Sequence, residues 1–432
     1  MKLTKCKLGE LIDVRRGASL SGEYYATEGE LIRLTLGNFD YQMGGFKKNT
    51  SKNDLYFIGP VKKEFILKEG DIITPLTEQT PGLLGSTAQI PISGKYIQSQ
   101  DVALVIPDES KLDKDFCYYL LPSKIVKQQL AAGAQQTKIR HTTPDRIKEL
   151  IVFIPELEEQ RHIGKLLKAI DRKIALNREI NRNLEAMARQ LYDYWFVQFD
   201  FPDENGRPYN SSGGKMVWNE RLKCYIPHEW NVTPISSWLT IKSGYPFKSE
   251  TYSKSGKYRI ITIKNVQEGY IDSSNCALLD IVPNDIKDYN YLKKGDCLIS
   301  LTGNCGRIGV VYEDNLLLNQ RVGLLNAEKD YQYYSILLFS NQQMRATCES
   351  LANGAAQANL SPVDICKVLS IEPPRNILKQ FNRIVSSIYH KIIASSEEIV
   401  QLTKQRDELL PLLMNGQVKV MPSEVNCDLS HD

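Results

Sequence analysis

Apolar residues recur at alternating spacings of four and three between Pro155 and Pro202. They fall at Ile163, Leu167, Ile170, Ile174, Leu184, Ala188, Leu191 and Trp195, with Asn177 and Asn181 at the two polar steps. This pattern predicts a coiled-coil seam rather than a general amphipathic face. Because no glycine or proline lies between Gly164 and Pro202, about 39 residues can form one helix roughly 58 Å long. One small domain cannot cover a helix of that length.

A second copy of this seam lies near the end of the chain. Its positions are Phe381, Val385, Ile388, Ile392, Ser395, Ile399, Leu402, Arg406, Leu409 and Leu413. If the two helices pair in antiparallel orientation, Asn181 faces Ser395, and this polar layer would fix the register at some cost in stability. The same overlap sets Trp195 opposite Phe381. The pattern therefore predicts that the chain supplies both helices of an antiparallel coiled coil.

Short sequences from the first half of the chain return in the same order in the second half. Val14–Gly17 matches Ile241–Gly244, Leu34–Asn38 matches Ile261–Asn265, Leu67–Ile73 matches Leu292–Leu298, and Gly133–Gln136 matches Gly354–Gln357. This order predicts a domain, a helix, a second domain and a second helix. The predicted bounds are 1–154 and 229–372 for the domains, 155–200 and 373–415 for the helices, 201–228 for a flexible linker rich in Gly, Ser and Asn, and 416–432 for a C-terminal tail.

Each repeated domain is predicted to be α+β. Its strands are short aliphatic or β-branched runs between Gly, Pro, Asn and Ser residues. They lie at 31–36, 71–74 and 102–106 in the first domain, and at 258–263, 297–300 and 322–325 in the second. A helical stretch follows each set, at 116–129 and 332–348. Strands followed by helices indicate mixed or antiparallel sheets.

Composition is typical of an ordinary cytoplasmic protein. The 432 residues are 42% hydrophobic and 24% charged, and no apolar run approaches the length of about 18 residues that a membrane helix needs. The N-terminus leads into no apolar signal region, which argues against secretion. Nine cysteines without a CxxC pair indicate reduced thiols. We therefore expect a cytoplasmic protein that does not associate with a membrane.

Net charge gives little indication of a nucleic-acid partner, since the chain carries only +3 at pH 7. Locally, the segment 124–148 contains six Lys or Arg residues and a single acid, Asp145. This basic strip is compatible with phosphate contact, and equally with a charged face in solvent. Charge therefore leaves both interpretations open.

Four segments resemble those of one known family. Leu191–Pro202 and Leu409–Val418 are similar to the ends of the two helical regions of type I restriction-modification specificity subunits. Pro155–Gln160 resembles the start of such a region, and Glu229–Val232 resembles the opening of a target recognition domain. The resemblance covers essentially the whole chain. The second helix departs from it at Pro373–Leu378, where the Glu-Gln pair is missing.

The resemblance implies a function. In that family each target recognition domain reads one half of a split sequence in double-stranded DNA, and the two helices hold the domains at a fixed spacing. Two modification (methyltransferase) subunits bind around these helices, and restriction (translocase and nuclease) subunits join the complex. Methyl transfer from S-adenosylmethionine and ATP-driven cleavage belong to those partners. The resemblance therefore implies a chain that is not an enzyme and that holds no cofactor or metal of its own.

Sequence motifs that would make the chain an enzyme are missing. It contains no GxxxxGK[ST] phosphate loop, no GxGxxG after a predicted strand and no [DN]PPY segment of an amino-methyltransferase. The five histidines form no metal-spaced pair. Gly303–Gly309 has the wrong spacing for a dinucleotide fingerprint, and is either a tight turn or a loop that brings Arg307 to DNA. Asp101, Glu109 and Lys111 mimic part of a nuclease site, but Asp101 lies too close in sequence to be a convincing metal partner.

Base recognition is expected from polar and basic side chains on loops between strands. Arg and Lys suit guanine O6 and N7, whereas Gln and Asn suit adenine N6 and N7. The candidates are Asn38, Thr77, Gln79, Gln100, Gln136, Lys138 and Arg140 in the first domain, and Lys264, Asn265, Arg307, Gln320, Arg321 and Gln357 in the second. Three pairs recur in both domains, Asn38 with Asn265, Gln100 with Gln320 and Gln136 with Gln357. They are expected to support the fold or contact phosphate, because domains that read different sequences must differ in their base contacts. Arg307 has no counterpart and is the stronger candidate for specificity.

Two further alternatives remain at this point. The aromatic residues Tyr192, Tyr194, Trp195, Phe196 and Phe199 are too many to bury on one helix seam. They therefore pack against the chain's own domains or dock a second protein. For the chain as a whole, the alternative to a DNA-specificity subunit is a coiled-coil adaptor whose duplicated domains bind protein. Such an adaptor would fail to bind any duplex, whatever the salt concentration.

Overall fold

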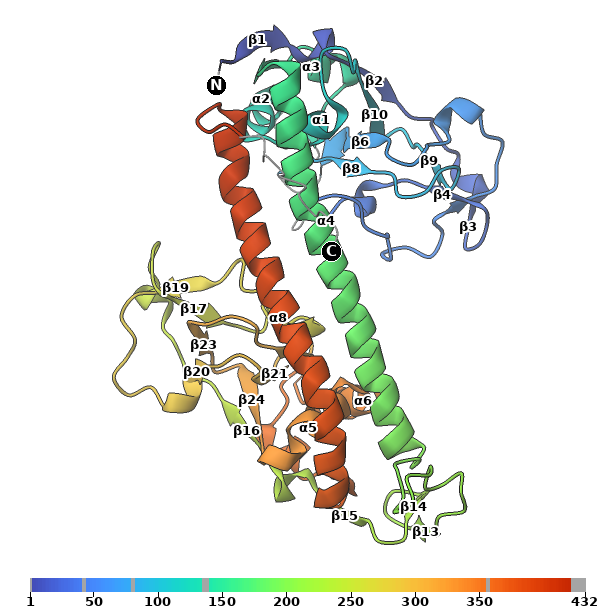
Figure 1. Ribbon diagram of the computed structural model, residues 1–432, viewed down its shortest axis with the longest axis vertical. Helices are drawn as coiled ribbons and strands as arrows, with labels where there is room; N and C mark the ends of the chain where they lie inside the picture. The colour runs from blue at the N-terminus through green and yellow to red at the C-terminus, as the bar shows by residue number, and fades with distance from the viewer. Residues whose placement is uncertain (1, 41–43, 79–81, 134–139, 355–357, 421–432) are drawn as a thin grey trace, which may run out of the picture. The chain divides into compact units, whose positions relative to one another are not determined.

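The computed structural model describes residues 2–40, 44–78, 82–133, 140–354 and 358–420. The chain forms two compact units, residues 1–174 with 401–432 and residues 175–400. Two long helices, α4 (Leu157–Tyr192) and α8 (Arg375–Met414), each contribute to both units (Figure 1). Each of the shorter elements belongs to one unit. The order of domain, helix, domain and helix follows the predicted repeat.

The first unit contains a small α+β domain built from short strands. Its strands are β1 (Thr4–Lys7), β2 (Ile12–Arg16), β3 (Tyr25–Ala26), β4 (Leu31–Arg33), β5 (Tyr56–Phe57), β6 (Ile72–Pro75), β7 (Thr77–Glu78), β8 (Ala88–Gln89), β9 (Tyr96–Ile97), β10 (Val102–Pro107), β11 (Arg140–His141) and β12 (Ile151–Ile154). Its short helices are α1 (Lys114–Leu120), α2 (Lys124–Gly133) and α3 (Pro144–Lys148). The strands form two four-stranded sheets, β2-β10-β6-β8 and β3-β5-β4-β9, and two ribbons, β1-β12 and β11-β7.

The second unit repeats this plan with longer sheets. Its strands are β13 (Met216–Asn219), β14 (Cys224–Pro227), β15 (Asn231–Pro234), β16 (Leu239–Ser243), β17 (Tyr258–Ile261), β18 (Gly269–Tyr270), β19 (Ala277–Leu279), β20 (Tyr291–Leu292), β21 (Cys297–Ser300), β22 (Ile308–Val310), β23 (Leu316–Leu318), β24 (Val322–Ala327) and β25 (Leu369–Glu372). Its short helices are α5 (Gln332–Ser340), α6 (Gln342–Leu351) and α7 (Pro362–Cys366). The sheets are β16-β24-β21-β22-β18 and β19-β17-β23-β20, with ribbons β15-β25 and β13-β14.

Both units contain mixed sheets. Most strand pairs are antiparallel, but β4 pairs with β9 in parallel, and β17 pairs in the same way with β23. The first and last strands of each domain also pair, β1 with β12 and β15 with β25. The predicted α+β class with mixed sheets is therefore confirmed.

The core of the first unit joins its short helices to the beginning of α4. Phe116 of α1 is buried in one cluster with Ile163 of α4 and Leu413 of α8. Gln160, from the predicted helix start, fixes this junction, because its Oε1 accepts a hydrogen bond from the Asp113 backbone N–H at 2.9 Å. The start of α4 is thus bound to the domain that precedes it.

Aromatic residues dominate the core of the second unit. The ring centroid of Phe196 lies 4.8 Å from that of Phe381 and 4.9 Å from that of Tyr334. The rings of Trp195 and Phe381, which the seam predicts to face each other, are 5.5 Å apart. Of the aromatic group at the end of α4, Tyr192, Trp195, Phe196 and Phe199 are buried, and Tyr194 is 37% exposed. Packing within the chain therefore accounts for four of these five residues.

The predicted seam residues of α4 and α8 are all buried or half-buried. Within the second unit, Asn181 Nδ2 donates to Ser396 Oγ at 2.8 Å, and Asn181 Oδ1 accepts from Ser395 Oγ, the pair that the seam predicts. Within the first unit, Arg406 Nη1 lies 2.9 Å from a carboxylate oxygen of Asp171. Among the described residues, no helix has both the length and the apolar character needed to cross a membrane.

Three helix predictions differ from the structure in detail. The stretch 116–129 is two helices, α1 and α2, since Pro122 lies between them. The stretch 332–348 is also two helices, because the Asn341 side chain accepts a hydrogen bond from the Gln343 backbone N–H at 2.8 Å and so starts α6. The helix predicted over 155–200 is regular only as far as Tyr192, where α4 ends. A π-helical turn follows at Asp193–Val197, and the left-handed backbone of Phe199 (φ 62°) ends the helical segment.

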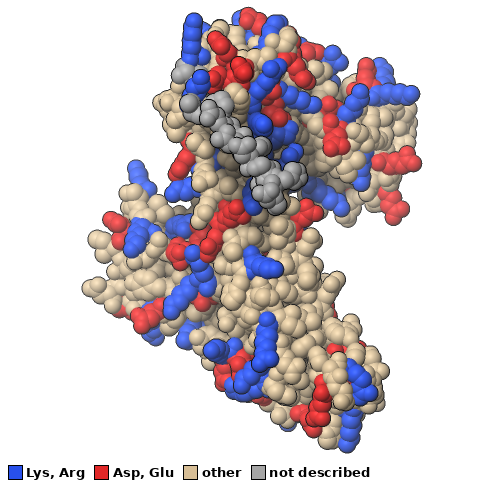
Figure 2. Space-filling view, in the orientation of Figure 1, with Lys and Arg blue, Asp and Glu red and all other residues tan. Residues whose placement is uncertain are grey.

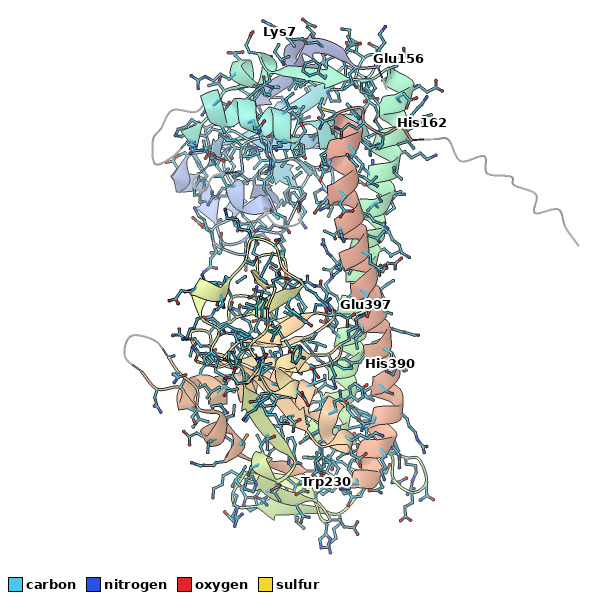
Figure 3. The ribbon with its side chains drawn as sticks, turned by 90° about the vertical axis from the view of Figure 1, so that its left-hand side faces the viewer. Lys7, Glu156, His162, Trp230, His390 and Glu397 are labelled. Carbon is cyan, nitrogen blue, oxygen red and sulfur yellow. The ribbon has the colours of Figure 1, made fainter. Side chains whose placement is uncertain are left out.

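The segment 201–228 is not the flexible loop that its composition predicts. It contains the hairpin β13-β14, on which Trp218 and Tyr225 face each other with ring centroids 5.2 Å apart. The Asp200 carboxylate accepts hydrogen bonds from the backbone N–H and the hydroxyl of Ser211 at 2.7 and 2.6 Å. Figure 3 places Trp230, which is buried, close to this segment. The polar residues that suggest a linker instead form ordered turns.

Candidate nucleic-acid interface

Both units close a short backbone bridge beside the predicted base-reading loops. In the first unit β7 pairs with β11, so that Thr77 lies opposite His141. In the second unit Thr302 forms the equivalent bridge with Asn359. The loops that follow β6 and β21 are thereby held against the segments that precede α3 and α7.

A buried carboxylate organises the bridge of the first unit. Glu78 is 3% exposed, and its Oε2 accepts hydrogen bonds from the backbone N–H groups of Gly82, Leu83 and Leu84 at 3.0, 2.9 and 3.0 Å. Its Oε1 lies 3.6 Å from Nη1 of Arg140. Because an unpaired buried charge is costly, these partners are what allow a carboxylate at this place. Glu78 therefore fixes the turn and holds Arg140 at the bridge.

Glycines take the place of this carboxylate in the second unit. Gly303 (φ 73°) and Gly306 (φ 80°) have left-handed backbones, and a Cβ at Gly306 would lie 2.6 Å from Cβ of Cys348 on α6. The turn closes through Ser300, whose hydroxyl accepts a hydrogen bond from the Arg307 backbone N–H at 3.1 Å. The glycine-rich stretch is therefore a tight turn, and Arg307 emerges from it half-buried. Contact between Arg307 and DNA stays a prediction.

Asn38 and Asn265 have the same structural role in the two units. Asn38 Oδ1 accepts from the Thr35 backbone N–H at 2.9 Å, and Asn265 Oδ1 accepts from that of Thr262 at the same distance. Each amide group also donates to a backbone carbonyl, and the two residues are only 1% and 6% exposed. A base cannot reach such side chains. They hold their turns, as expected for residues that the repeats share, and we remove them from the base-contact candidates.

The remaining candidates differ in exposure. Gln100, Lys264, Gln320 and Arg321 are exposed, Arg140 and Arg307 are half-buried, and Thr77 is buried. Gln79, Gln136, Lys138 and Gln357 lie outside the described residues. Long exposed side chains on loops can enter a DNA groove, whereas the buried Thr77 is placed to support the bridge.

The basic strip 124–148 is largely engaged within the first unit. Lys127 Nζ donates to the Gly82 carbonyl at 3.1 Å, and burial lowers the pKa of this lysine. Lys148 Nζ lies 2.7 Å from the Asp13 carboxylate, and hydrogen bonds from Lys148 and Arg15 lower the pKa of Asp13 to about 2. On the face shown in Figure 2, Lys and Arg are interspersed with Asp and Glu. Lys127, Lys148 and Arg140, three of the six basic residues of the strip, thus have partners within the first unit.

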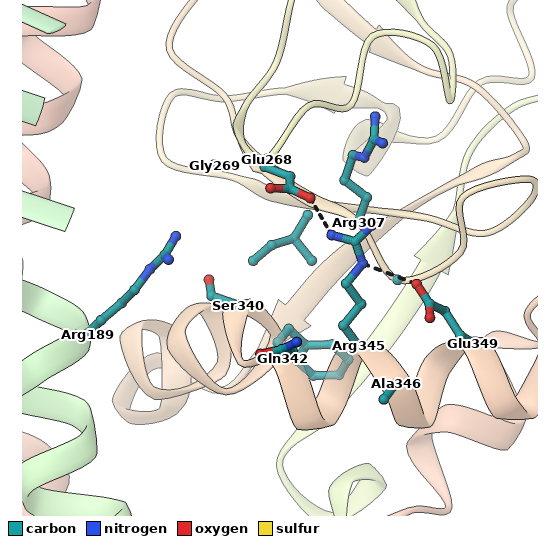
Figure 4. Close-up of a pocket in the computed structure, with 12 residues that line it drawn as sticks. Arg189, Glu268, Gly269, Arg307, Ser340, Gln342, Arg345, Ala346 and Glu349 are labelled. Carbon is teal, nitrogen blue, oxygen red and sulfur yellow. Dashed lines mark hydrogen bonds and ion pairs between the residues drawn. The ribbon is translucent and has the colours of Figure 1, made fainter. Parts of the chain in front are cut away.

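A polar cavity of about 450 Å³ lies beside Arg307 in the second unit. Its charged lining residues are Arg189, Glu268, Arg307, Arg345 and Glu349. Figure 4 shows the guanidinium of Arg345 between the carboxylates of Glu268 and Glu349. Its polar neighbours Ser340 and Gln342 come from the junction of α5 and α6.

An apolar groove of about 580 Å³ lies on the second-unit parts of α4 and α8. It is lined by Met187, Gln190, Leu191, Asp193, Tyr194, Gln198, Ile384 and Ile388. Met187 is 55% exposed and Ile384 is 46% exposed. Large apolar side chains left in solvent on one surface are typical of a protein docking site.

Within the part of the chain that the structure describes, no group of three or more His, Cys, Asp or Glu residues could hold a metal ion. Lys111, part of the weighed nuclease interpretation, has its Nζ 2.9 Å from the Asp108 carboxylate.

Sequence reasoning missed Glu78, Glu268 and Arg345. Glu78 stands between two predicted candidates, but nothing in a single sequence distinguishes a buried acid from an exposed one. Glu268 and Arg345 lie far apart in the chain and meet only through the fold. The repeat offers one usable signal, since Thr77-Glu78 aligns with Thr302-Gly303 and marks a place where the two domains differ.

Duplicated α+β domains, each with a bridged pair of loops, combined with two long helices, define a class of DNA-specificity proteins. The chain belongs to the family of type I restriction modification DNA specificity domains, whose model matches residues 2–186 and 227–402. It is 26% identical over 366 residues to the MjaIX specificity subunit of Methanocaldococcus jannaschii, covering 82% of this chain and 79% of that protein. It is 22% identical over 373 residues to the HindI specificity subunit of Haemophilus influenzae, covering 75% of this chain and 81% of that one.

The fold agrees with this family. The solved S subunit of a type I restriction-modification system from M. genitalium superposes with a TM-score of 0.58 at 18% sequence identity, and the match covers 96% of each chain. The resemblance expected from the helix ends and domain openings is therefore confirmed.

Proposed function

We propose that this chain is the DNA-specificity subunit of a type I restriction-modification complex, and that each unit reads one half of a split target. The observation that carries the proposal is the duplicated bridge. Thr77 and Thr302 hold equivalent positions, but the next residue is Glu78 in one domain and Gly303 in the other. A shared backbone with different side chains is what two readers of different half-sites need.

The proposed base contacts in the second domain are Arg307, Lys264 and Arg321, whose side chains are exposed or half-buried. In the first domain they are Arg140, together with Gln79 and Lys138. Gln100, Gln136 and Gln320, which recur between the repeats, are proposed to support the fold or contact phosphate. Loss of one bidentate contact to a base pair reduces discrimination at that pair by about 1–3 kcal/mol. Arg307→Ala should therefore relax one position of one half-site.

We further propose that the long helices set the length of the spacer between the two half-sites. Support comes from the Asn181–Ser395 contact in the second unit and the Asp171–Arg406 contact in the first, both of which join α4 to α8. An antiparallel coiled coil with a polar layer keeps one register. Inserting one turn of four residues, about 6 Å of helix, should change the spacer and leave both half-sites unchanged.

The apolar groove on α4 and α8 is proposed as the docking site for one modification subunit, and a second would bind elsewhere around these helices; together they would supply methyl transfer. Restriction subunits would join through that complex. The chain itself would then be non-catalytic and without a cofactor. Met187→Glu in the groove should weaken modification-subunit binding, because it places a charge where apolar surface must be buried.

The test is methylation mapping across a genome after co-expression with a matching modification subunit. A split motif with a fixed gap, present only with this chain, is expected. A stable complex that adds no methylation would reject DNA readout by these domains. If the purified complex also binds no duplex at low salt, the protein-binding adaptor is the better description.

A further inference from the structure

Helix α6 supports two loops of the second unit that carry candidate base contacts. The turn before Arg307 rests on it through Gly306, which packs against Cys348 so closely that no Cβ fits. The loop that carries Lys264 and ends at Gly269 is bound to the same helix through Arg345 (Figure 4). The relative position of the two loops therefore depends on one helix.

Arg345 makes the second of these connections with both carboxylates of the polar cavity. Its Nη1 donates to Oε1 of Glu268, and its Nε donates to Oε1 of Glu349 at 3.2 Å. Glu349 belongs to α6 itself, one turn further on, whereas Glu268 belongs to the loop. The hydrogen bond from Arg345 also lowers the pKa of Glu268, so the loop carboxylate is ionised at neutral pH.

The loop transmits this connection to Arg307. Gln267, next to Glu268, accepts a hydrogen bond from Arg307 Nη1 at 3.4 Å, and the Val266 carbonyl lies 3.5 Å from the same nitrogen. Gln267 Nε2 in turn donates to the Lys264 carbonyl at 2.8 Å. These long contacts orient the guanidinium without enclosing it, and its Nε is buried with no hydrogen-bond partner among the described residues. The direction of Arg307 thus follows from where the loop is held.

We propose that Arg345 is a positioning residue for base selection by the second domain, acting through the Glu268 ion pair on the loop that orients Arg307. The inference rests on the proposed function. Arg345 is not itself the proposed DNA contact, because its Nη1 and Nε are already bound to the carboxylates of Glu268 and Glu349. Breaking the pair leaves α6 intact and frees the loop, so Arg307 loses its fixed direction toward one base pair.

The test uses the complete complex with its modification subunits. Methylation rates are measured on a panel of duplexes that vary one base pair at a time across both half-sites. Glu268→Gln keeps the shape of an exposed side chain and removes its charge. The matched control is Glu349→Gln, which removes the other carboxylate on Arg345 without touching the loop.

With Glu268→Gln, discrimination at one base pair of the second half-site should fall at least tenfold, and the first half-site should stay unchanged. Arg307→Ala should relax the same base pair, and the double variant should add nothing further. Glu349→Gln should discriminate as the unaltered protein does. The double variant Glu268→Arg with Arg345→Glu, which exchanges the two charges, should restore part of the discrimination.

Three results would overturn the proposal. One is a Glu268→Gln profile identical to that of the unaltered protein, another is an equal slowing on every duplex, and the third is relaxation at a base pair that Arg307→Ala leaves untouched. Failure of the proposed function is distinct from these results, because the unaltered complex would then methylate no split sequence at all.

Discussion

The two recognition domains close the same bridge with different chemistry. In the first, Oε1 of Glu78 lies 3.6 Å from Nη1 of Arg140, and the carboxylate accepts hydrogen bonds from three backbone N–H groups. In the second, the backbone N–H of Gly303 donates to the Ala358 carbonyl at 3.0 Å, and left-handed glycines make the turn. One domain uses a buried charge where the other uses backbone freedom.

The difference shows which residues of the repeat the backbone conformation requires and which residues can change. Asn38 and Asn265 keep the same hydrogen bonds because the backbone needs them in either domain. The bridge residues are free to change provided that the turn is stabilised in some way. Variation beside an invariant backbone is how one architecture can read two sequences.

The largest effect is expected from Glu78→Ala in the first domain. Three backbone N–H groups, those of Leu83 and Leu84 buried, lose their acceptor and Arg140 loses its partner, so the domain should lose about 3 kcal/mol or more of stability. Denaturant unfolding followed by a probe in the first unit would measure it. Glu78→Gln, which keeps one acceptor oxygen, should cost less. A loss below about 1 kcal/mol for Glu78→Ala would mean that the charge is dispensable there.

A matched pair should give the next largest effect. Asn38→Ala and Asn265→Ala each remove one hydrogen bond from a backbone N–H and one to a backbone carbonyl, and Asn265→Ala also removes the bond from the Thr262 hydroxyl. Each should lower the free energy of unfolding by about 2 kcal/mol, and because the backbone contacts are the same, the two values should agree within about 1 kcal/mol. Unequal losses would show that the repeats do not share this support after all.

A pH experiment takes up Glu185, a carboxylate of α4 in the second unit, for comparison with Glu78, whose carboxylate accepts three backbone hydrogen bonds. Burial raises the pKa of Glu185, against a smaller opposing effect of Arg189, and Tyr312 and Tyr389 also face it. A carboxyl group whose pKa is higher in the folded than in the unfolded state contributes stability that is fully present below the unfolded-state pKa. This contribution is lost as pH rises through the folded-state pKa. Glu185→Gln should therefore be more stable than the unaltered protein at pH 7, with the gap closing near pH 4. Calorimetry at several pH values would check this, and a gap independent of pH would contradict it.

The smallest effects should come from Gln100→Ala and Gln320→Ala. Both side chains are exposed, so each change should alter stability by less than about 0.5 kcal/mol. Methylation of varied duplexes would then separate function from folding. If neither half-site responds, these glutamines do not contact bases.

Periodicity predicted the long elements well, because a seam is a local pattern. The 4-3-4-3 spacing located α4 and α8, and the repeat offset paired Asn181 with Ser395 and Trp195 with Phe381. Alignment of the repeats predicted that Asn38 and Asn265 either support the fold or contact phosphate, and their buried hydrogen bonds favour the first role.

Features that depend on tertiary contacts could not be predicted in this way. The burial of Glu78 depends on a turn four to six residues further along the chain, and the Glu268–Arg345 pair depends on the packing of α6. The hairpin β13-β14 was missed because its Gly, Ser and Asn residues also occur in ordered turns. Local composition cannot distinguish a tight turn from a mobile loop.

The pairing of β1 with β12, and of β15 with β25, has a consequence for how new specificities arise. Each domain enters and leaves the helical scaffold through one two-stranded ribbon, so its ends lie side by side. Segments with adjacent ends are easily replaced as whole cassettes. Lys294 of the second domain also lies 2.9 Å from Glu397 of α8, which Figure 3 labels, and Glu328 pairs with Arg375 of the same helix. A graft would have to preserve such side-chain matches. Under the proposed function, recombination at the ribbons would therefore exchange a whole recognition domain, and with it one half-site, in one event. The helices α4 and α8 would stay unchanged.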